Sequence, residues 1–137
     1  MVYFPIEPFR DLKDVKDDEF WTVRNCFAHM IYENNIDIDL FKKFIIRGGV
    51  AGDVDWGVEK WNIYSEEDHG IEAYYDGYLF FLGEEELGRD RGVGESQVIL
   101  SKDEIKPYIH HIVDWYKKRI DSNVEELIKL AKENGFY

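Results

Sequence analysis

The first third of the chain carries apolar residues at the spacing of a helix. They recur three or four positions apart at Phe20, Val23, Phe27, Met30 and Ile31. This period predicts an amphipathic helix that begins at Asp17–Asp18 and ends at Asn34–Asn35. A second, shorter helix is expected to begin at Asp37 or Asp39 and to end at Gly48–Gly49, a pair that is typical of helix C-termini.

The middle of the chain changes from the period of a helix to the two-residue period of β-strands. Apolar and polar residues alternate around Trp61 and Ile63, and again from Ile71 to Tyr75. Asp76–Gly77 is a tight-turn signal, and it predicts a hairpin between the second of these strands and the next. Residues Tyr78–Leu82 are nearly all apolar, which is typical of a central strand that is covered on both faces.

The last third of the chain predicts one more strand and two helices. The strand is expected from Gln97 to Leu100. Ser101–Glu104 fits a capping box, in which the serine and glutamate side chains each satisfy a free amide at the start of a helix. An apolar stripe from Ile105 to Ile120 predicts the helix behind it. A second capping box at Ser122–Glu125 opens a terminal helix that we expect to end at Asn134–Gly135.

These elements place the chain in the α+β class. N-terminal helices precede a central antiparallel sheet, and two C-terminal helices follow it. Residues 1–137 fit a single domain, and 45% hydrophobic residues suffice for a folded core. Cys26 is the single cysteine, the N-terminus lacks the pattern of a signal peptide, and no apolar run approaches the roughly 20 residues of a membrane span. We therefore expect a cytoplasmic protein that does not enter membranes.

Charge changes this picture because it is concentrated in one segment. The chain has a net charge of -12, and residues 53–95 hold thirteen acidic residues against Lys60, Arg89 and Arg91. The same segment is rich in aromatic residues: Trp56, Trp61, Tyr64, Tyr74, Tyr75, Tyr78, Phe80 and Phe81. Aromatic side chains anchor interfaces, and carboxylates steer a partner of opposite charge. The pattern favours a basic protein partner, and it disfavours direct binding of nucleic acid or of anionic membranes.

Candidate partner-binding residues are the acidic and aromatic side chains of this segment that we expect to be exposed. They are Asp53, Asp55, Trp56, Glu59, Glu66, Glu67, Asp68, Glu72, Tyr74, Asp76, Tyr78, Glu84, Glu85, Glu86 and Asp90. Trp56 lies in a loop rich in glycine and aspartate, so we expect it to be the central anchor. Tyr74 and Tyr78 flank the predicted turn and are expected to be exposed. The other aromatic and apolar residues of the strands are expected in the core, namely Trp61, Ile63, Tyr75 and Phe81.

No segment of the sequence matches the residue spacing of a known ion-binding or phosphate-binding motif. Residues 53–64 begin like a calcium-binding loop, but Val58 occupies the position that requires glycine and Tyr64 the position that requires glutamate. Residues 88–94 are rich in glycine but lack the Lys-Ser/Thr pair of a phosphate-binding loop. Neighbouring histidines on a helix point about 100° apart, so His110 and His111 are poorly placed to share a metal ion. We expect no cofactor and no metal site.

Two features of the sequence allow a catalytic interpretation as well as a structural one. Carboxylate pairs suited to hydrolysis occur in any acidic protein, so the runs at residues 66–68 and 84–86 favour a solvated or binding face. Cys26 lies near His29 but among apolar helix positions, which predicts a buried and inert thiol. We therefore expect a protein that is not an enzyme.

Three stretches of the sequence resemble a known class of proteins. They are Phe20–Phe27, Val58–Tyr64 and Asp76–Phe81, and the likeness extends from about Asp17 to the C-terminus. Together with the acidic α+β pattern, they resemble bacterial toxin-immunity proteins of contact-dependent growth inhibition systems, which neutralise ribonuclease toxins. The resemblance implies a cytoplasmic protein that forms a one-to-one heterodimer with a basic nuclease toxin domain and blocks its active site or substrate surface. The class has no invariant motif, so no functional residue is carried over from it.

Two other functions stay open at the level of sequence. The first is a small hydrolase that uses a carboxylate pair or Cys26. The second is a nucleic-acid mimic that inhibits a DNA-binding protein, whose electrostatics would equal those of an immunity protein.

Overall fold

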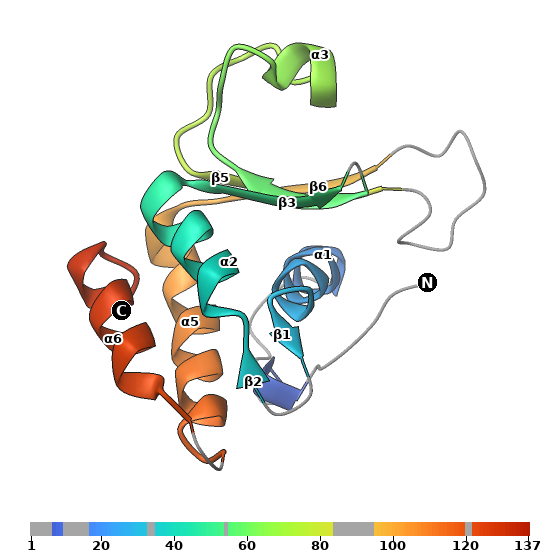
Figure 1. The fold of residues 1–137 in the computed structure, drawn as a ribbon. Helices are drawn as coiled ribbons and strands as arrows, with labels where there is room; N and C mark the ends of the chain where they lie inside the picture. Colours follow the sequence, from blue (N-terminus) through green and yellow to red (C-terminus); the bar gives the residue numbers. More distant parts are fainter. Residues whose placement is uncertain (1–6, 10–16, 33–34, 54, 84–94, 120–121) are drawn as a thin grey trace.

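The computed structural model describes residues 7–9, 17–32, 35–53, 55–83, 95–119 and 122–137. Helices from both ends of the chain pack around a central antiparallel sheet, which confirms the α+β class (Figure 1). The helices are η1 (Glu7–Phe9), α1 (Asp17–Ala28), α2 (Ile38–Lys42), η2 (Lys43–Arg47), α3 (Ser65–His69), α5 (Lys102–Tyr116) and α6 (Val124–Glu133). The strands are β1 (Ile31–Tyr32), β2 (Asn35–Ile36), β3 (Gly49–Asp53), β4 (Trp56–Glu59), β5 (Tyr78–Leu82) and β6 (Ser96–Leu100).

The main sheet has four strands in the order β3-β4-β5-β6, and every neighbouring pair is antiparallel. Phe80 of β5 is in register with Val58 on one side and with Val98 on the other. All five residues of β5 are buried. The prediction of a central strand that is covered on both faces is therefore confirmed.

One face of the sheet packs on helices α1, α2 and α5, whereas α3 lies over the opposite face (Figure 1). Aromatic rings fill the helix side, where Phe27 lies 5.5 Å from Phe80 and 5.8 Å from Phe44 between ring centroids. Cys26 is fully buried in the same core, and its thiol contacts the carbonyl oxygens of Gly57 and Phe81 at 3.6 and 3.4 Å. The prediction of a buried thiol is confirmed.

Helix ends follow only part of the sequence signals. Helix α1 ends at Ala28 and not at the predicted Asn34–Asn35, because the residues that follow pair as strands β1 and β2. Asp37 caps α2 by accepting hydrogen bonds from two amides, and the helical segment ends at Gly48, whose φ is 75°. Ser101 and Glu104 form the expected capping box at the start of α5. The second capping box is wrong: Asn123 precedes α6 without a side-chain cap, and it donates instead to the Glu126 carboxylate.

Residues 60–77 do not form the predicted strands. The Asn62 side chain accepts a hydrogen bond from the Tyr64 amide, and the Ser65 hydroxyl accepts one from the Asn62 amide. These local bonds compete with strand pairing and lead the chain into α3. Asp76–Gly77 is likewise a bend that enters β5 and not a hairpin turn, because β5 pairs with β4 and β6.

Candidate partner-binding surface

The segment 60–77, called the excursion below, leaves the sheet after β4 and returns to it at β5. It covers the sheet face opposite the helices (Figure 1). Its large apolar side chains point to solvent: Ile63 is 79% exposed, Tyr64 57% and Tyr74 69%. The prediction that Tyr74 is exposed is confirmed, and the prediction that Ile63 belongs to the core is wrong.

Carboxylates surround these apolar side chains on the excursion. Five acidic residues stand against Lys60, and all five are exposed: Glu66, Glu67, Asp68, Glu72 and Asp76. Three of them lie together in the single turn of α3 (Ser65–His69), which is followed by Gly70 with φ of 70°. The excursion thus combines exposed apolar area with concentrated negative charge.

A polar cluster, called the His69 cluster below and made of Glu59, His69 and Glu95, holds the excursion to the sheet. The His69 side chain is only 7% exposed; its Nε2 lies 2.9 Å from Glu59 Oε1 and its Nδ1 lies 2.5 Å from Glu95 Oε1. The Gln97 amide donates to the His69 carbonyl oxygen at 2.8 Å. A histidine with both ring nitrogens protonated would donate to a carboxylate on each side. The cluster therefore links α3 to β4 and to the start of β6.

Burial has the largest effect on the pKa of Glu59, the carboxylate of this cluster that belongs to β4. Desolvation raises the pKa of Glu59, and the nearby positive charge of His69 opposes this rise. Asp68 raises the pKa of Glu59 further through charge repulsion. His69 Nε2 lies 2.9 Å from Glu59 Oε1, and a hydrogen bond from His69 adds to the effect of its charge in lowering the pKa of Glu59.

Apolar contacts beneath the excursion depend on one glycine. The ring of Phe81 lies 4.3 Å from that of His69 between centroids, on the side of the sheet that the excursion covers. Phe81 is in register with Gly57, where an added Cβ would lie 2.6 Å from Phe81 Cζ. Only a residue without a side chain leaves room for the Phe81 ring across β4. Phe81 is buried, as predicted.

Two other aromatic residues of the excursion are half-buried between the exposed side chains and the sheet. The Tyr75 hydroxyl donates to the Glu59 carbonyl oxygen at 3.2 Å, and burial raises the pKa of Tyr75 to about 12. The rings of Trp61 and Tyr74 meet edge to face at 5.5 Å. Trp61 and Tyr75 contribute to a local packed layer, which agrees only in part with their predicted place in the core.

Two of the predicted anchors are buried instead of exposed. Trp56 is the first residue of β4, and it faces the helices with its ring stacked on His29 at 4.5 Å. Tyr78 is the first residue of β5, is 2% exposed, and packs against Phe44 and Phe136. Both predictions are wrong because each strand begins with a residue that points into the helix side. The exposed apolar residues that the sequence missed, Ile63 and Tyr64, come directly before the acidic run.

Of the remaining residues that were predicted to bind a partner, some are half-buried and the others lie outside the described residues. Asp55 and Glu59 are half-buried; Asp55 lines an open hollow together with Asp68, His69 and Glu95. Asp53 ends β3, and its side chain lies outside the description. The other predicted acidic residues lie outside the described residues altogether: Glu84, Glu85, Glu86 and Asp90.

In the described part of the chain, no group of three or more histidine, cysteine, aspartate or glutamate side chains is arranged to hold a metal ion. Nor is any helix of these residues long and apolar enough to cross a membrane. His110 is exposed and stacks on the ring of Tyr137 at 4.2 Å. Comparison with protein-family models, with curated proteins and with solved structures found no match.

Proposed function

We propose that this chain is an immunity protein that binds a cognate basic nuclease toxin domain and neutralises it. The observation that carries the proposal is the excursion, where Ile63, Tyr64 and Tyr74 are exposed among five exposed carboxylates. Large apolar side chains with a charged surround are typical of interfaces between proteins. The class of partner rests on the sequence resemblance and on charge complementarity to a protein that binds RNA.

In this mechanism the carboxylates of α3 take the place of substrate phosphates. Glu66, Glu67 and Asp68 would face lysine and arginine side chains of the toxin, and thereby cover its active site or its substrate-binding surface. Opposite charge speeds the first encounter of the partners, and this acceleration weakens as salt is added. The exposed apolar side chains then slow dissociation by burying their area. The complex would be a heterodimer in the cytoplasm.

The experiment that tests the proposal is protection of growing cells. The protein encoded by the neighbouring gene would be expressed alone, with this chain, and with a variant that carries Glu66→Lys, Glu67→Lys and Asp68→Lys. We expect toxicity alone, full growth with the natural chain, and loss of protection with the variant. A matched control places the same charge change on the helices at three other exposed acids: Asp114→Lys, Glu125→Lys and Glu133→Lys. The control is expected to protect.

Two outcomes contradict the proposal. If the neighbouring domain is harmless by itself, this chain has no toxin to neutralise. If the α3 variant protects as well as the natural chain, the acidic excursion does not bind the toxin. A nucleic-acid mimic is separated by a competition measurement: it would displace DNA from several unrelated basic proteins, whereas an immunity protein prefers one partner.

A further inference from the structure

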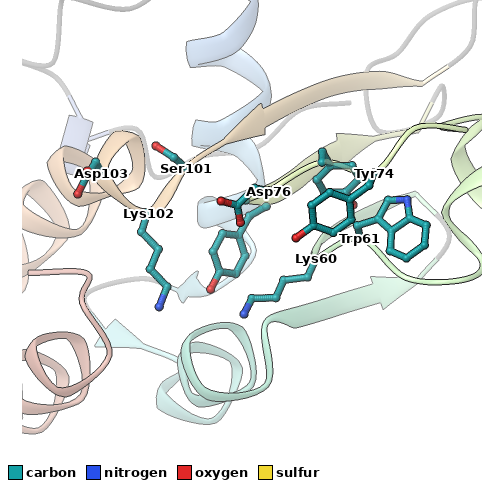
Figure 2. Close-up of a pocket in the computed structure, with 10 residues that line it drawn as sticks. Lys60, Trp61, Tyr74, Asp76, Ser101, Lys102 and Asp103 are labelled. Atoms are coloured by element: carbon teal, nitrogen blue, oxygen red, sulfur yellow. The ribbon is translucent and has the colours of Figure 1, made fainter.

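A cleft of about 370 Å³ opens where the excursion meets the start of α5. Figure 2 shows the side chains of Lys60 and Lys102 extending in the same direction, with Asp76 between their starting points. Four aromatic residues also line the cleft: Trp61, Tyr74, Tyr75 and Tyr78. This volume lies within the range of about 300–1,000 Å³ that is usual for small-molecule sites.

The charge of the cleft is opposite to that of the chain. Neither Lys60 nor Lys102 has a carboxylate within ion-pair distance among the described residues; Lys102 Nζ donates to a carbonyl oxygen, that of Asn134, at 3.0 Å. Asp103 at the rim lies 3.1 Å from Lys106, which offsets its charge. Counting Lys106 at the rim, three ammonium groups therefore stand against the two carboxylates of Asp76 and Asp103, in a chain whose net charge is -12.

The hydroxyl of a tyrosine adds a hydrogen-bond donor to this cleft. Tyr78 lines the cleft and is almost wholly buried, yet its hydroxyl has no hydrogen-bond partner among the described residues. Burial raises the pKa of Tyr78, so the hydroxyl keeps its proton and stays a donor. Lys60 Nζ lies 5.5 Å from the centre of the same ring. An anion in the cleft would meet a neutral donor and two cations, beside aromatic walls.

We propose that the cleft binds a small aromatic molecule with a single carboxylate. The aromatic body would pack beside Trp61 and Tyr74, and the carboxylate would lie between Lys60 and Lys102 within reach of the Tyr78 hydroxyl. One negative charge matches the local excess of one positive charge, and a carboxylate accepts several donors at once. This inference does not depend on the toxin partner, because the ligand is a small molecule and no residue of α3 lines its site.

The test is a titration of the ¹⁵N-labelled protein by NMR at constant ionic strength. The probes share one skeleton and differ in charge: phenylacetate, the neutral phenylacetamide and the cationic phenethylamine. We expect saturable shifts at the amides of Gly77, Ser101 and Lys102. Phenylacetate should bind about tenfold more tightly than the amide, because one charge-assisted contact contributes about that much. The proposal is overturned if the amide or the amine binds as tightly as the acid, or if the shifts at the cleft do not saturate.

Single substitutions in the cleft should change the affinity for phenylacetate in opposite directions, which a loss of folding would not do. Lys60→Met and Lys102→Met keep the long side chain, and each should weaken phenylacetate binding about fivefold. Asp76→Asn removes the opposing carboxylate and should strengthen binding about threefold. Lys129→Met, at an exposed lysine of α6 outside the cleft, should have no effect. Tyr78→Phe keeps the buried ring and should weaken binding about threefold. Equal effects of Lys60→Met and Lys129→Met, or weaker binding by Asp76→Asn, would contradict the site.

Discussion

The two faces of the sheet are covered in different ways, although they share the same strands. On the helix face, Phe80 packs against aromatic rings of α1 and η2. On the other face, Phe81 is covered by the excursion, which is fastened by the His69 cluster. Apolar burial stabilises the first face, whereas the second depends on polar contacts near solvent. The difference fits the proposed function, in which the helix face supports the fold and the excursion face binds a partner.

The largest expected effect is on the helix face. Phe80→Ala should lower the free energy of unfolding by about 3–5 kcal/mol, because it removes a fully buried ring from a packed core. Ile63→Ala should change it by less than about 0.5 kcal/mol, because that side chain lies on the surface. Urea unfolding of both variants measures the contrast. A similar loss in both would mean that the excursion is part of the core.

A smaller loss of stability is expected from a substitution at Gly57, in strand β4. Gly57→Ala places a methyl group against the Phe81 ring and should destabilise the protein by about 1–3 kcal/mol. Phe81→Leu shortens the side chain that the methyl group meets, so the double variant should be more stable than the sum of the two single changes implies. Thermal unfolding of the four proteins measures this coupling. Strict additivity would show that the two residues do not compete for space.

The His69 cluster should affect the excursion more than the helices. His69→Gln leaves Glu59 and Glu95 facing each other without the imidazole, which should cost about 1–2 kcal/mol. Amide hydrogen exchange should show faster opening of α3, with the protection of α5 little changed. An equal loss of protection in both helices would mean that the two faces unfold as one unit.

The smallest expected effect is a pH dependence from Tyr75. Its pKa rises from 10.0 to about 12 on folding, so the folded state holds this proton more tightly than the unfolded chain. The resulting contribution to stability is complete below pH 10.0 and is lost as the pH rises towards about 12. Tyr75→Phe should therefore lose less stability over this range, as measured by the difference in Tm between the two proteins. Parallel curves would contradict the link between burial and this pKa.

Sequence predicted the helix face better than the excursion face for a physical reason. The apolar periods of α1 and α5, and the continuous run of β5, report burial directly. The excursion was missed because the hydrogen bonds of Asn62 and Ser65 outweigh a weak alternation of apolar residues. Strands β3 and β4 were missed because their glycine and aspartate disfavour strands, and pairing with β5 overrides that preference.

Exposure was predicted correctly for the carboxylates of the excursion and wrongly for Trp56 and Tyr78. Carboxylates such as Glu67 and Glu72 are costly to bury, so their exposure follows from the sequence. Exposure of an aromatic residue depends instead on which face of a strand it occupies. Trp56 and Tyr78 start strands and point to the helices, whereas Tyr74 precedes a strand and points to solvent. A shift of a strand boundary by one residue reverses such a prediction.

The central claim is that the excursion binds the basic partner, and the association rate tests it most directly. Stopped-flow measurements would compare the natural chain, the α3 charge-reversal variant and the matched helix variant with the toxin domain at several salt concentrations. The α3 variant should associate about ten- to a hundredfold more slowly and with a weaker dependence on salt. The helix variant has the same net charge and should stay within about threefold of the natural chain. Equal slowing of both variants would contradict the claim, because only the net charge would then matter.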